Sequence, residues 1–307
     1  MKNNINILIK LGFAFIIIIL ISGFVLNFDV LTALKTDGEE SKYKVYALEL
    51  PDSLNFAGEK ILLQSPDLRE RLDRELLVNT YWQSNMMLLI KRANKYFPTI
   101  EKILAEEGVP IDLKYLSVVE SGLDNVISPA GAKGFWQIMR TTGREYGLEV
   151  NSNVDERYHL EFSTRMAAKY LKRAREKFGS WTLAAASFNR GISGIQRSLN
   201  TQKVESYFDL RLGQETSRYV FRALALKEII ENPPKYGYIF DKSDLYLNIP
   251  VRYHALDTAI SNLATFAQKM GVNYKILKIH NPWLLQNHLK NRSRKHYKIA
   301  IPENGYY

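Results

Sequence analysis

The sequence predicts a mainly α-helical protein that ends in a small β-α-α-β module. Across most of residues 56–235, apolar side chains recur at three- and four-residue spacing, as on one face of a helix. Near the C-terminus, residues 245–251 and 296–301 alternate apolar and polar side chains as strands do, and two helical stretches, at residues 257–270 and 274–279, lie between them. An uncharged apolar run at residues 11–28 precedes the helical part of the chain.

The apolar run predicts a targeting segment. Residues 11–28 carry no charge, and Lys2 and Lys10 come before them. A membrane-spanning helix needs about 20 apolar residues, whereas the apolar core of a cleaved signal peptide has about 7–15 residues and precedes a small-residue cleavage site. An uncleaved signal anchor is therefore favoured over a cleaved signal peptide for residues 1–30. Residues 31–55 are polar and predict a linker.

Composition limits the possible functions. The formal net charge is +10, which suggests either an anionic partner or a basic surface that favours solubility. Export of the chain argues against nucleic acid. The absence of cysteine excludes disulfides, thiol nucleophiles and a lipid-modified N-terminal Cys, so the protein is not a lipoprotein. Its five histidines are scattered without metal-ligand spacing, so we expect no metal and no other cofactor.

The helical stretches divide the exported part into three regions. Residues 56–108 predict an N-terminal helical region, with a helical pattern over residues 56–98 and a separate short helix at residues 100–105 that ends at Gly108. Residues 109–235 predict a second helical region, whose first helix ends at Gly122 because glycine readily adopts the left-handed backbone that ends helices. Residues 236–307 contain the β-α-α-β pattern. Further helices of the second region are expected at residues 163–178, 181–188 and 216–231.

One carboxylate lies at the end of the helix that Gly122 closes. Glu120 shares a helical face with Leu113 and Leu116. Partial burial disfavours an ionised carboxylate and raises its pKa, and a raised pKa suits a general acid that works at neutral pH. The alternative is a helix-end glutamate that reaches water or a nearby cation, and periodicity alone favours that alternative.

The segment after this helix, SPAGAKGFWQIM at residues 128–139, combines turn residues, glycines and aromatics. Gly131 and Gly134 would allow a ligand to approach the backbone closely. Phe135 and Trp136 would offer flat apolar surface on which sugar rings stack. A tight turn with an aromatic core plug is the structural alternative for these two aromatic residues.

Four ordered motifs resemble the catalytic domain of the soluble-type lytic transglycosylases. They are ESG at residues 120–122 with SPAGAKGFWQIM and TTGREYGL up to residue 148, VDER with STRMAAKYL at residues 154–171, ASFNRG at residues 186–191, and QETSRYV at residues 214–220. The resemblance covers residues 56–302 and implies a lysozyme-like, helical catalytic domain at residues 109–235. It also implies a place on the periplasmic side of a bacterial cell envelope, with a membrane anchor formed by the N-terminal segment.

The resemblance implies a peptidoglycan lyase that cleaves the MurNAc–GlcNAc β-1,4 bond without water and leaves a 1,6-anhydro sugar. Glu120 would protonate the glycosidic oxygen and then accept the proton of the C6 hydroxyl. Most glycosidases use two carboxylates, and no second acidic residue stands at motif spacing here. A hydrolytic muramidase on the same fold and a non-catalytic peptidoglycan-binding protein remain as alternatives.

Several residues match family positions that line the sugar cleft. They are Ser121, Ser128, Gln137, Phe188, Asn189, Glu215 and Tyr219. Phe188 departs from the family, which has Tyr there with a hydroxyl near the catalytic carboxylate. Its phenyl ring predicts that Glu120 is less well held, and that either the enzyme is slower or a sugar subsite is slightly displaced. Three residues also have structural alternatives, namely core packing for Tyr219, a helix first-turn charge for Glu215 and a turn cap for Asn189.

The C-terminal region resembles a divergent LysM-like peptidoglycan-binding module. Its usual Gly-Asp-Thr-Leu is absent, and residues 255–258 are the nearest approach, whereas Asn281 matches the module's Asn after the second helix. The region would either bind glycan or act as a structural cap on the catalytic domain. The partners expected for the whole protein are therefore peptidoglycan glycan strands and the membrane, and not nucleic acid.

Overall fold

The computed structural model describes residues 45–303 of the 307-residue chain. The chain from Leu48 onward forms one compact unit. The expected signal anchor or signal peptide lies outside the described residues. Within residues 45–303, no helix is both long enough and apolar enough to span a bilayer.

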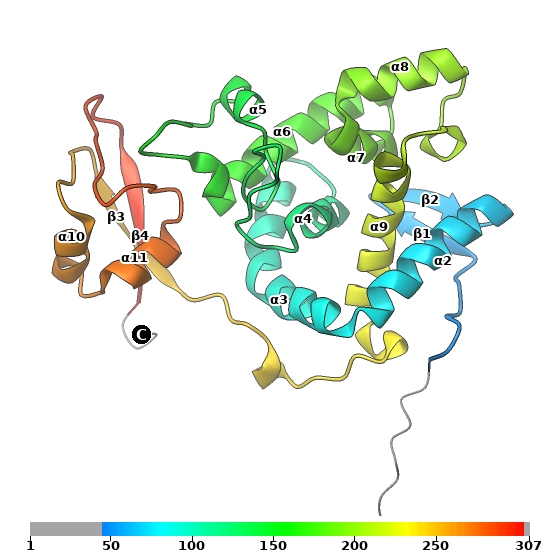
Figure 1. Cartoon of the computed structure of the whole chain (residues 1–307), viewed down its shortest axis with the longest axis horizontal. Helices are drawn as coiled ribbons and strands as arrows, with labels where there is room; N and C mark the ends of the chain where they lie inside the picture. The colour runs from blue at the N-terminus through cyan, green and yellow to red at the C-terminus, as the bar shows by residue number, and fades with distance from the viewer. Residues whose placement is uncertain (1–44, 304–307) are drawn as a thin grey trace, which may run out of the picture. The chain divides into compact units, whose positions relative to one another are not determined.

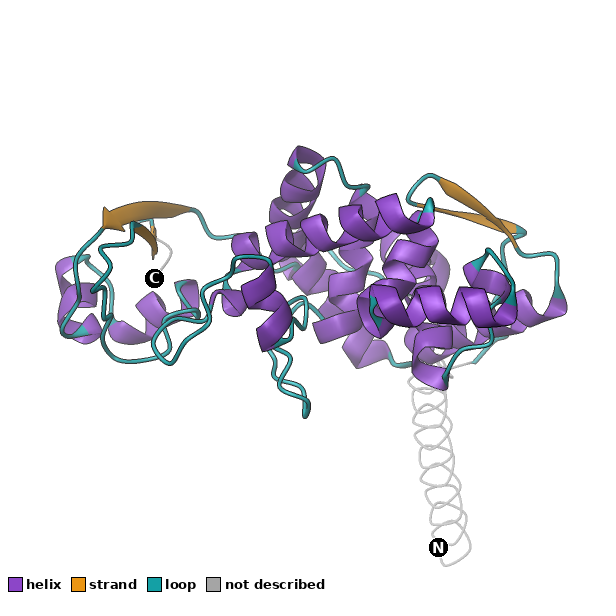
Figure 2. Cartoon of the chain, turned by 90° about the horizontal axis from the view of Figure 1, so that it is seen from above, coloured by secondary structure: helices purple, strands orange, loops and turns teal. Residues whose placement is uncertain are grey.

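Helices make up most of the described chain, and its named strands form two antiparallel pairs (Figure 2). Strand β1 (Ser53–Phe56) pairs with β2 (Glu59–Leu62), and β3 (Val251–Leu256) pairs with β4 (Tyr297–Pro302). The helices are α2 (Pro66–Tyr81), α3 (Gln83–Glu106), α4 (Lys114–Ser121), α5 (Arg140–Glu145), α6 (Leu160–Phe178), α7 (Trp181–Arg190), α8 (Ile192–Gln202), α9 (Gln214–Glu231), α10 (Leu263–Lys269) and α11 (Tyr274–His280). The expected mainly α-helical class is confirmed.

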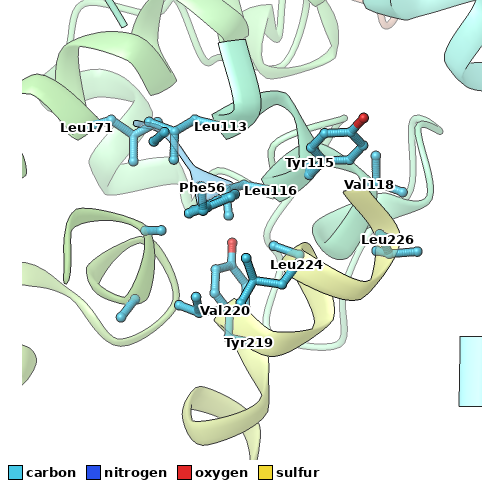
Figure 3. Close-up of a cluster of buried hydrophobic side chains, with 14 of the residues drawn as sticks. Phe56, Leu113, Tyr115, Leu116, Val118, Leu171, Tyr219, Val220, Leu224 and Leu226 are labelled. Carbon is cyan, nitrogen blue, oxygen red and sulfur yellow. The ribbon is translucent and has the colours of Figure 1, made fainter. Parts of the chain in front are cut away.

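Helix α9 joins the main helices into one core. It packs against α2, α4 and α7, and Figure 1 shows it beside α4. Figure 3 shows Leu116 of α4, Leu224 of α9 and Phe56 of β1 in one cluster of buried hydrophobic side chains. All three side chains are buried, and burial of a side chain of this size contributes roughly 1.5–3 kcal/mol. This packing fixes α4, and with it Glu120, against α9.

The helix ends expected from glycine are confirmed. Gly122 follows α4 with a φ of 63°, and Gly179 follows α6 with a φ of 67°. Both values lie in the left-handed region, which glycine enters without a steric penalty. At the start of the next helix, α7, the Ser180 hydroxyl is the N-terminal cap and accepts the Leu183 N–H at 3.3 Å.

The N-terminal region differs from the expected pattern in two ways. It opens with the β1–β2 hairpin, although residues from Phe56 onward were expected to be helical. Helix α3 then continues through Pro98, so the separate short helix expected near residues 100–105 is its last part. Proline removes one helical hydrogen bond. Buried Phe97 and Ile100 on either side of it keep this part of α3 packed against the core.

The expected β-α-α-β pattern is present at the C-terminus, but one strand was misplaced. The strand expected at residues 245–251 begins only at Val251, directly after Pro250. Proline cannot donate to a strand ladder. Helix α10 also starts later than expected, at Leu263, because the Asn262 side chain accepts the N–H groups of the first turn. Strand β4 lies within one residue of its expected position.

The β1–β2 hairpin is joined to α7 by a single carboxylate. Glu59 accepts hydrogen bonds from the hydroxyl of Ser180 at 3.0 Å, from the N–H of Trp181, and from both the N–H and the hydroxyl of Thr182 at 3.0 and 2.7 Å. Burial alone would raise the pKa of Glu59, but these hydrogen bonds outweigh it and lower the pKa. The carboxylate therefore serves as a second N-terminal cap of α7, supplied from outside the helix.

We expect Glu59→Gln to destabilise the fold. The amide carries no charge and has one acceptor oxygen, so the mutant loses charge-assisted hydrogen bonds worth about 1.5–3 kcal/mol. Urea unfolding at pH 7 would measure the loss of unfolding free energy. Glu49→Gln is the matched control because Glu49 is exposed. Equal stability of the two variants would contradict the capping role.

Candidate active site

The candidate active site is centred on the end of α4. Glu120 is half-buried there, and the buried Tyr219 of α9 donates its hydroxyl to the Glu120 Oε1 atom at 2.6 Å. In Figure 3, the Tyr219 hydroxyl points from α9 toward the side chains of α4. Tyr219 therefore packs in the core and also holds the carboxylate, so the two roles considered for it are combined.

Burial controls the acidity of Glu120. Desolvation raises its pKa from the ordinary value of 4.5 to about 7. The hydrogen bond from Tyr219 opposes this rise, the negative charge of Glu215 adds to it, and the positive charge of Arg222 opposes it. The pKa of Tyr219 itself is raised well above 10, first by burial and then by Glu120. Tyr219 thus stays a neutral donor, and Glu120 exists in both protonation states near neutral pH.

A second carboxylate lies within electrostatic reach of Glu120. Glu215 stands in the first turn of α9 and accepts a hydrogen bond from the Asn189 amide at 3.1 Å. The carbonyl oxygen of the same amide accepts the Thr216 hydroxyl at 2.7 Å. Asn189 therefore joins the end of α7 to the start of α9. Sequence spacing did not reveal that Glu215 approaches Glu120.

The segment at residues 128–139 is a tight loop in which predicted sugar-binding side chains also brace the backbone. The Ser128 hydroxyl accepts the N–H of Ala132 at 3.0 Å. The Gln137 amide donates to the carbonyl of Val126 at 3.0 Å and to that of Gly134 at 2.8 Å. Gln137 itself has a φ of 45°, which is uncommon outside glycine. The two hydrogen bonds from the Gln137 side chain hold its backbone in this conformation.

Ser121 acts in the same way at the other end of this loop. Its hydroxyl donates to the carbonyl oxygens of Ser117 at 3.0 Å and Phe135 at 2.9 Å. It also accepts the N–H of Asp124 at 3.3 Å. These contacts attach the loop to the end of α4. A direct contact of Ser121 with substrate stays a prediction.

The aromatic residues of the loop lie in the core, as the structural alternative predicted. Phe135 and Trp136 are 4% and 0% exposed, so neither offers a face to a sugar. The Trp136 indole N–H donates to the Thr164 hydroxyl of α6 at 2.9 Å. Gly134 also differs from expectation, because a Cβ there would lie 2.0 Å from the carbonyl oxygen of Arg157. Its missing side chain makes room for this neighbouring backbone and not for a ligand.

A cleft of about 530 Å³ adjoins the loop. Three of the predicted residues, Gln137, Phe188 and Asn189, line it together with Met139 and Tyr170. Met139 ends the quoted motif, is 43% exposed and supplies apolar surface to the cleft. The other predicted residues are not part of this lining, namely Glu120, Ser121, Ser128, Glu215 and Tyr219.

Phe188 is placed by two aromatic neighbours. Its ring meets Trp136 edge-on at 5.9 Å and Tyr170 edge-on at 5.3 Å, measured between ring centroids. The phenyl ring supplies no hydroxyl, but Tyr219 provides one to Glu120 from the opposite helix. The carboxylate is therefore held despite the departure at residue 188. A slower reaction caused by Phe188 stays a prediction.

Two segments of the chain match known domain families. Residues 98–210 match the family described as the transglycosylase SLT domain. Residues 252–305 match the soluble lytic transglycosylase C-terminal LysM-like domain. The chain carries an SLT domain followed by a LysM-like domain. The expected class of enzyme domain, a lytic transglycosylase, is thereby confirmed.

Individual proteins are similar to parts of this chain. The chain is 28% identical to membrane-bound lytic murein transglycosylase D of Escherichia coli (strain K12) over 80% of this chain and 56% of the relative. The chain thus spans about half the length of that relative. Among solved structures, the 70 kDa soluble lytic transglycosylase of Escherichia coli is 18% identical over 50% of this chain and 27% of its own, with a TM-score of 0.38. An inactive mutant of lytic transglycosylase Slt from Pseudomonas aeruginosa is 21% identical over 49% and 26%, with a TM-score of 0.36.

The raised pKa of Glu120 predicts a stability cost for the SLT domain. Between pH 4.5 and about pH 7 the native carboxyl keeps its proton while the unfolded one has lost it. Stability therefore falls as the pH rises through this window. We expect Glu120→Gln to raise the unfolding free energy by about 3 kcal/mol at pH 8 and by almost nothing at pH 4. Urea unfolding at both pH values, with Glu205→Gln at an exposed site as control, would show this; a gain independent of pH would contradict it.

The role of Tyr219 predicts a change in acidity. Its hydroxyl stabilises the ionised form of Glu120, so Tyr219→Phe should raise the pKa of Glu120 above its present value of about 7. A ¹³C NMR titration of the side-chain carboxyl would measure the shift. Tyr207→Phe is the matched control, because the Tyr207 hydroxyl donates to backbone carbonyls of Thr216 and Ser217 in the same helix. A lowered or unchanged pKa in Tyr219→Phe would rule out the proposed hydrogen bond.

Proposed function

We propose that this protein is a peptidoglycan lytic transglycosylase that cleaves the β-1,4 bond between MurNAc and GlcNAc without water. The observation that carries the proposal is the state of Glu120, whose pKa is about 7 and whose carboxylate is held by Tyr219 at 2.6 Å. A group with this pKa can donate a proton and accept one at the same pH. A single residue can then act in both steps of the reaction.

In the first step, protonated Glu120 gives its proton to the glycosidic oxygen while the bond from MurNAc C1 to that oxygen breaks. The N-acetyl group of the substrate would assist by stabilising the charge at C1. In the second step, ionised Glu120 takes the proton of the C6 hydroxyl as that oxygen bonds to C1. The product is a 1,6-anhydro sugar, and Glu120 returns to its protonated form.

The neighbouring polar residues would bind the glycan strand. Gln137 and Asn189 line the cleft next to the loop, and both carry amides of the kind that hydrogen-bond sugar hydroxyls. Met139 and Phe188 provide apolar surface in the same cleft. Ser128 would contact sugar at the outer side of the loop, where it is partly exposed.

A hydrolytic muramidase is the second candidate, and one observation favours it. Glu215 lies close enough to raise the pKa of Glu120, and Asn189 donates a hydrogen bond to the Glu215 carboxylate. Most glycosidases use two carboxylates, one of which activates water or attacks the sugar. Glu215 could take that part. The two candidates differ in the product, which ends in 1,6-anhydro-MurNAc in one case and in reducing MurNAc in the other.

The site of action would be the cell envelope. The relative in Escherichia coli is named a membrane-bound murein transglycosylase, and residues 11–28 carry the uncharged apolar run of a signal anchor. We therefore propose export, with retention at the membrane through this segment. Peptidoglycan glycan strands would be the partner of both the SLT domain and the LysM-like domain.

Digestion of purified sacculi tests the proposed function. We expect the wild type to release muropeptides that end in 1,6-anhydro-MurNAc, identified by mass spectrometry. Glu120→Gln should reduce release at least about 100-fold, since general acid–base catalysis contributes roughly 10²–10⁴ in rate. Glu205→Gln, at an exposed site, should match the wild type. Reducing MurNAc ends would favour the muramidase, and equal activity of wild type and Glu120→Gln would eliminate Glu120 as the acid.

A further inference from the structure

A short segment of the SLT domain is built into the LysM-like domain. The Asp155 N–H donates to the carbonyl of Trp283 at 2.9 Å, and the Leu285 N–H donates to the carbonyl of Asn153 at 2.9 Å. Between them, Val154 pairs with Leu284 as in an antiparallel sheet. Val154 is 1% exposed and belongs to the same hydrophobic cluster as the buried residues of the LysM-like domain. The LysM-like core is therefore completed by a residue of its neighbour.

Charged groups hold the same segment at both ends. Lys295, next to β4, places its ammonium 2.8 Å from Glu149 and 2.7 Å from Glu156. The Tyr297 hydroxyl donates to Glu149 at 2.9 Å. Burial alone would raise the pKa of Glu149, but the hydrogen bonds from Lys295 and Tyr297 outweigh it and lower the pKa. The LysM-like domain therefore binds the backbone, the apolar centre and the acidic ends of residues 149–156.

This segment leads directly to Arg157, which reaches into the active-site loop. Asp155 holds the Arg157 guanidinium in a two-point ion pair, with Nε to Oδ1 at 2.8 Å and Nη2 to Oδ2 at 2.7 Å. The Nη1 atom donates to the carbonyls of Gly131 at 3.2 Å and Ile138 at 3.1 Å. The Arg157 side chain is only 4% exposed. One buried guanidinium thus bonds the loop both near its start, at Gly131, and near its end, at Ile138.

We propose that the LysM-like domain positions the active-site loop of the SLT domain, through the contact chain from Trp283 and Lys295 to Asp155, Arg157 and residues 128–139. Asp155 and Arg157 are positioning residues, because they act on the loop backbone at Gly131 and Ile138 and not on the substrate. The inference rests on the proposed function of the site. It assigns to the LysM-like domain a part in shaping the catalytic cleft, in addition to any binding of glycan.

The physical reason lies in the composition of the loop. Residues 128–139 include Gly131 and Gly134, both with positive φ, and glycine gives an unfolded loop much conformational freedom to lose. Bonds from a buried, charge-paired arginine offset that entropy cost. When Asp155 no longer aligns the guanidinium, the loop should open more often, and displacement of a substrate-binding group by about 1 Å can cost roughly 100-fold in rate.

The test is amide hydrogen exchange of the full chain in two variants and one control. Asp155→Asn removes the charge that aligns Arg157, and Lys295→Met removes the two ion pairs supplied by the LysM-like domain. Lys298→Met makes the same change on an exposed side chain of β4. The loop amides of Ser128, Gly134 and Ile138 are hydrogen-bonded and so should exchange slowly in the wild type. We expect exchange there to become at least about tenfold faster in both variants, with α9 unchanged and the control like the wild type.

Activity on sacculi supplies the second readout. We expect both variants to lose about 10- to 100-fold in rate while their unfolding midpoints stay near that of the control. Wild-type loop exchange in both variants would overturn the proposal, and so would faster exchange with unchanged activity. A wild type that releases no anhydro product would instead overturn the proposed function, and the exchange data would still decide whether the LysM-like domain holds the loop.

Discussion

The hydrogen bond between Tyr219 and Glu120 depends on the burial of both side chains. Burial of the Glu120 carboxylate lowers the stability of the fold at neutral and higher pH, because it disfavours the ionised form. Desolvation raises the pKa of Glu120 to about 7, and Tyr219 at 2.6 Å limits that rise while it keeps the carboxylate in one place. Both groups require α4 and α9 to stay in contact, which the packing of Leu116 and Leu224 provides. Folding energy is thus used to hold an acid at a pKa suited to proton transfer in both directions.

Around this pair, polar side chains build the site before any substrate enters. Ser121, Ser128 and Gln137 each hydrogen-bond the backbone of the loop that follows α4. Asn189 of α7 donates its side-chain amide to the Glu215 carboxylate of α9. If the proposed function holds, a loop so rich in glycine needs this bracing, because each binding group must stay within a small displacement of its working position. Arg157 extends the bracing from the loop to the LysM-like domain.

Local signals in the sequence located most helices and the helix ends that glycine sets, but not the other limits. Gly122 and Gly179 end α4 and α6 because the left-handed backbone there is a property of the residue itself. The β1–β2 hairpin and the course of α3 through Pro98 were missed, since both depend on packing against distant parts of the chain. The misplaced strand before Val251 shows the same limit, because alternation alone does not indicate where a partner strand lies.

By itself, the sequence determined the order of the motifs and the helix ends at glycine, because those features are written in neighbouring residues. Glu120 became the candidate acid only through the family resemblance that the motifs carry, since periodicity alone favoured an inert carboxylate. Only the tertiary structure decided that Tyr219, 99 residues further along the chain, donates to Glu120, and that Glu215 approaches the same carboxylate. It also decided that Phe135 and Trp136 are core residues and that Val154 completes the LysM-like core. Burial and pairing between distant segments produce these features, and no local pattern encodes them.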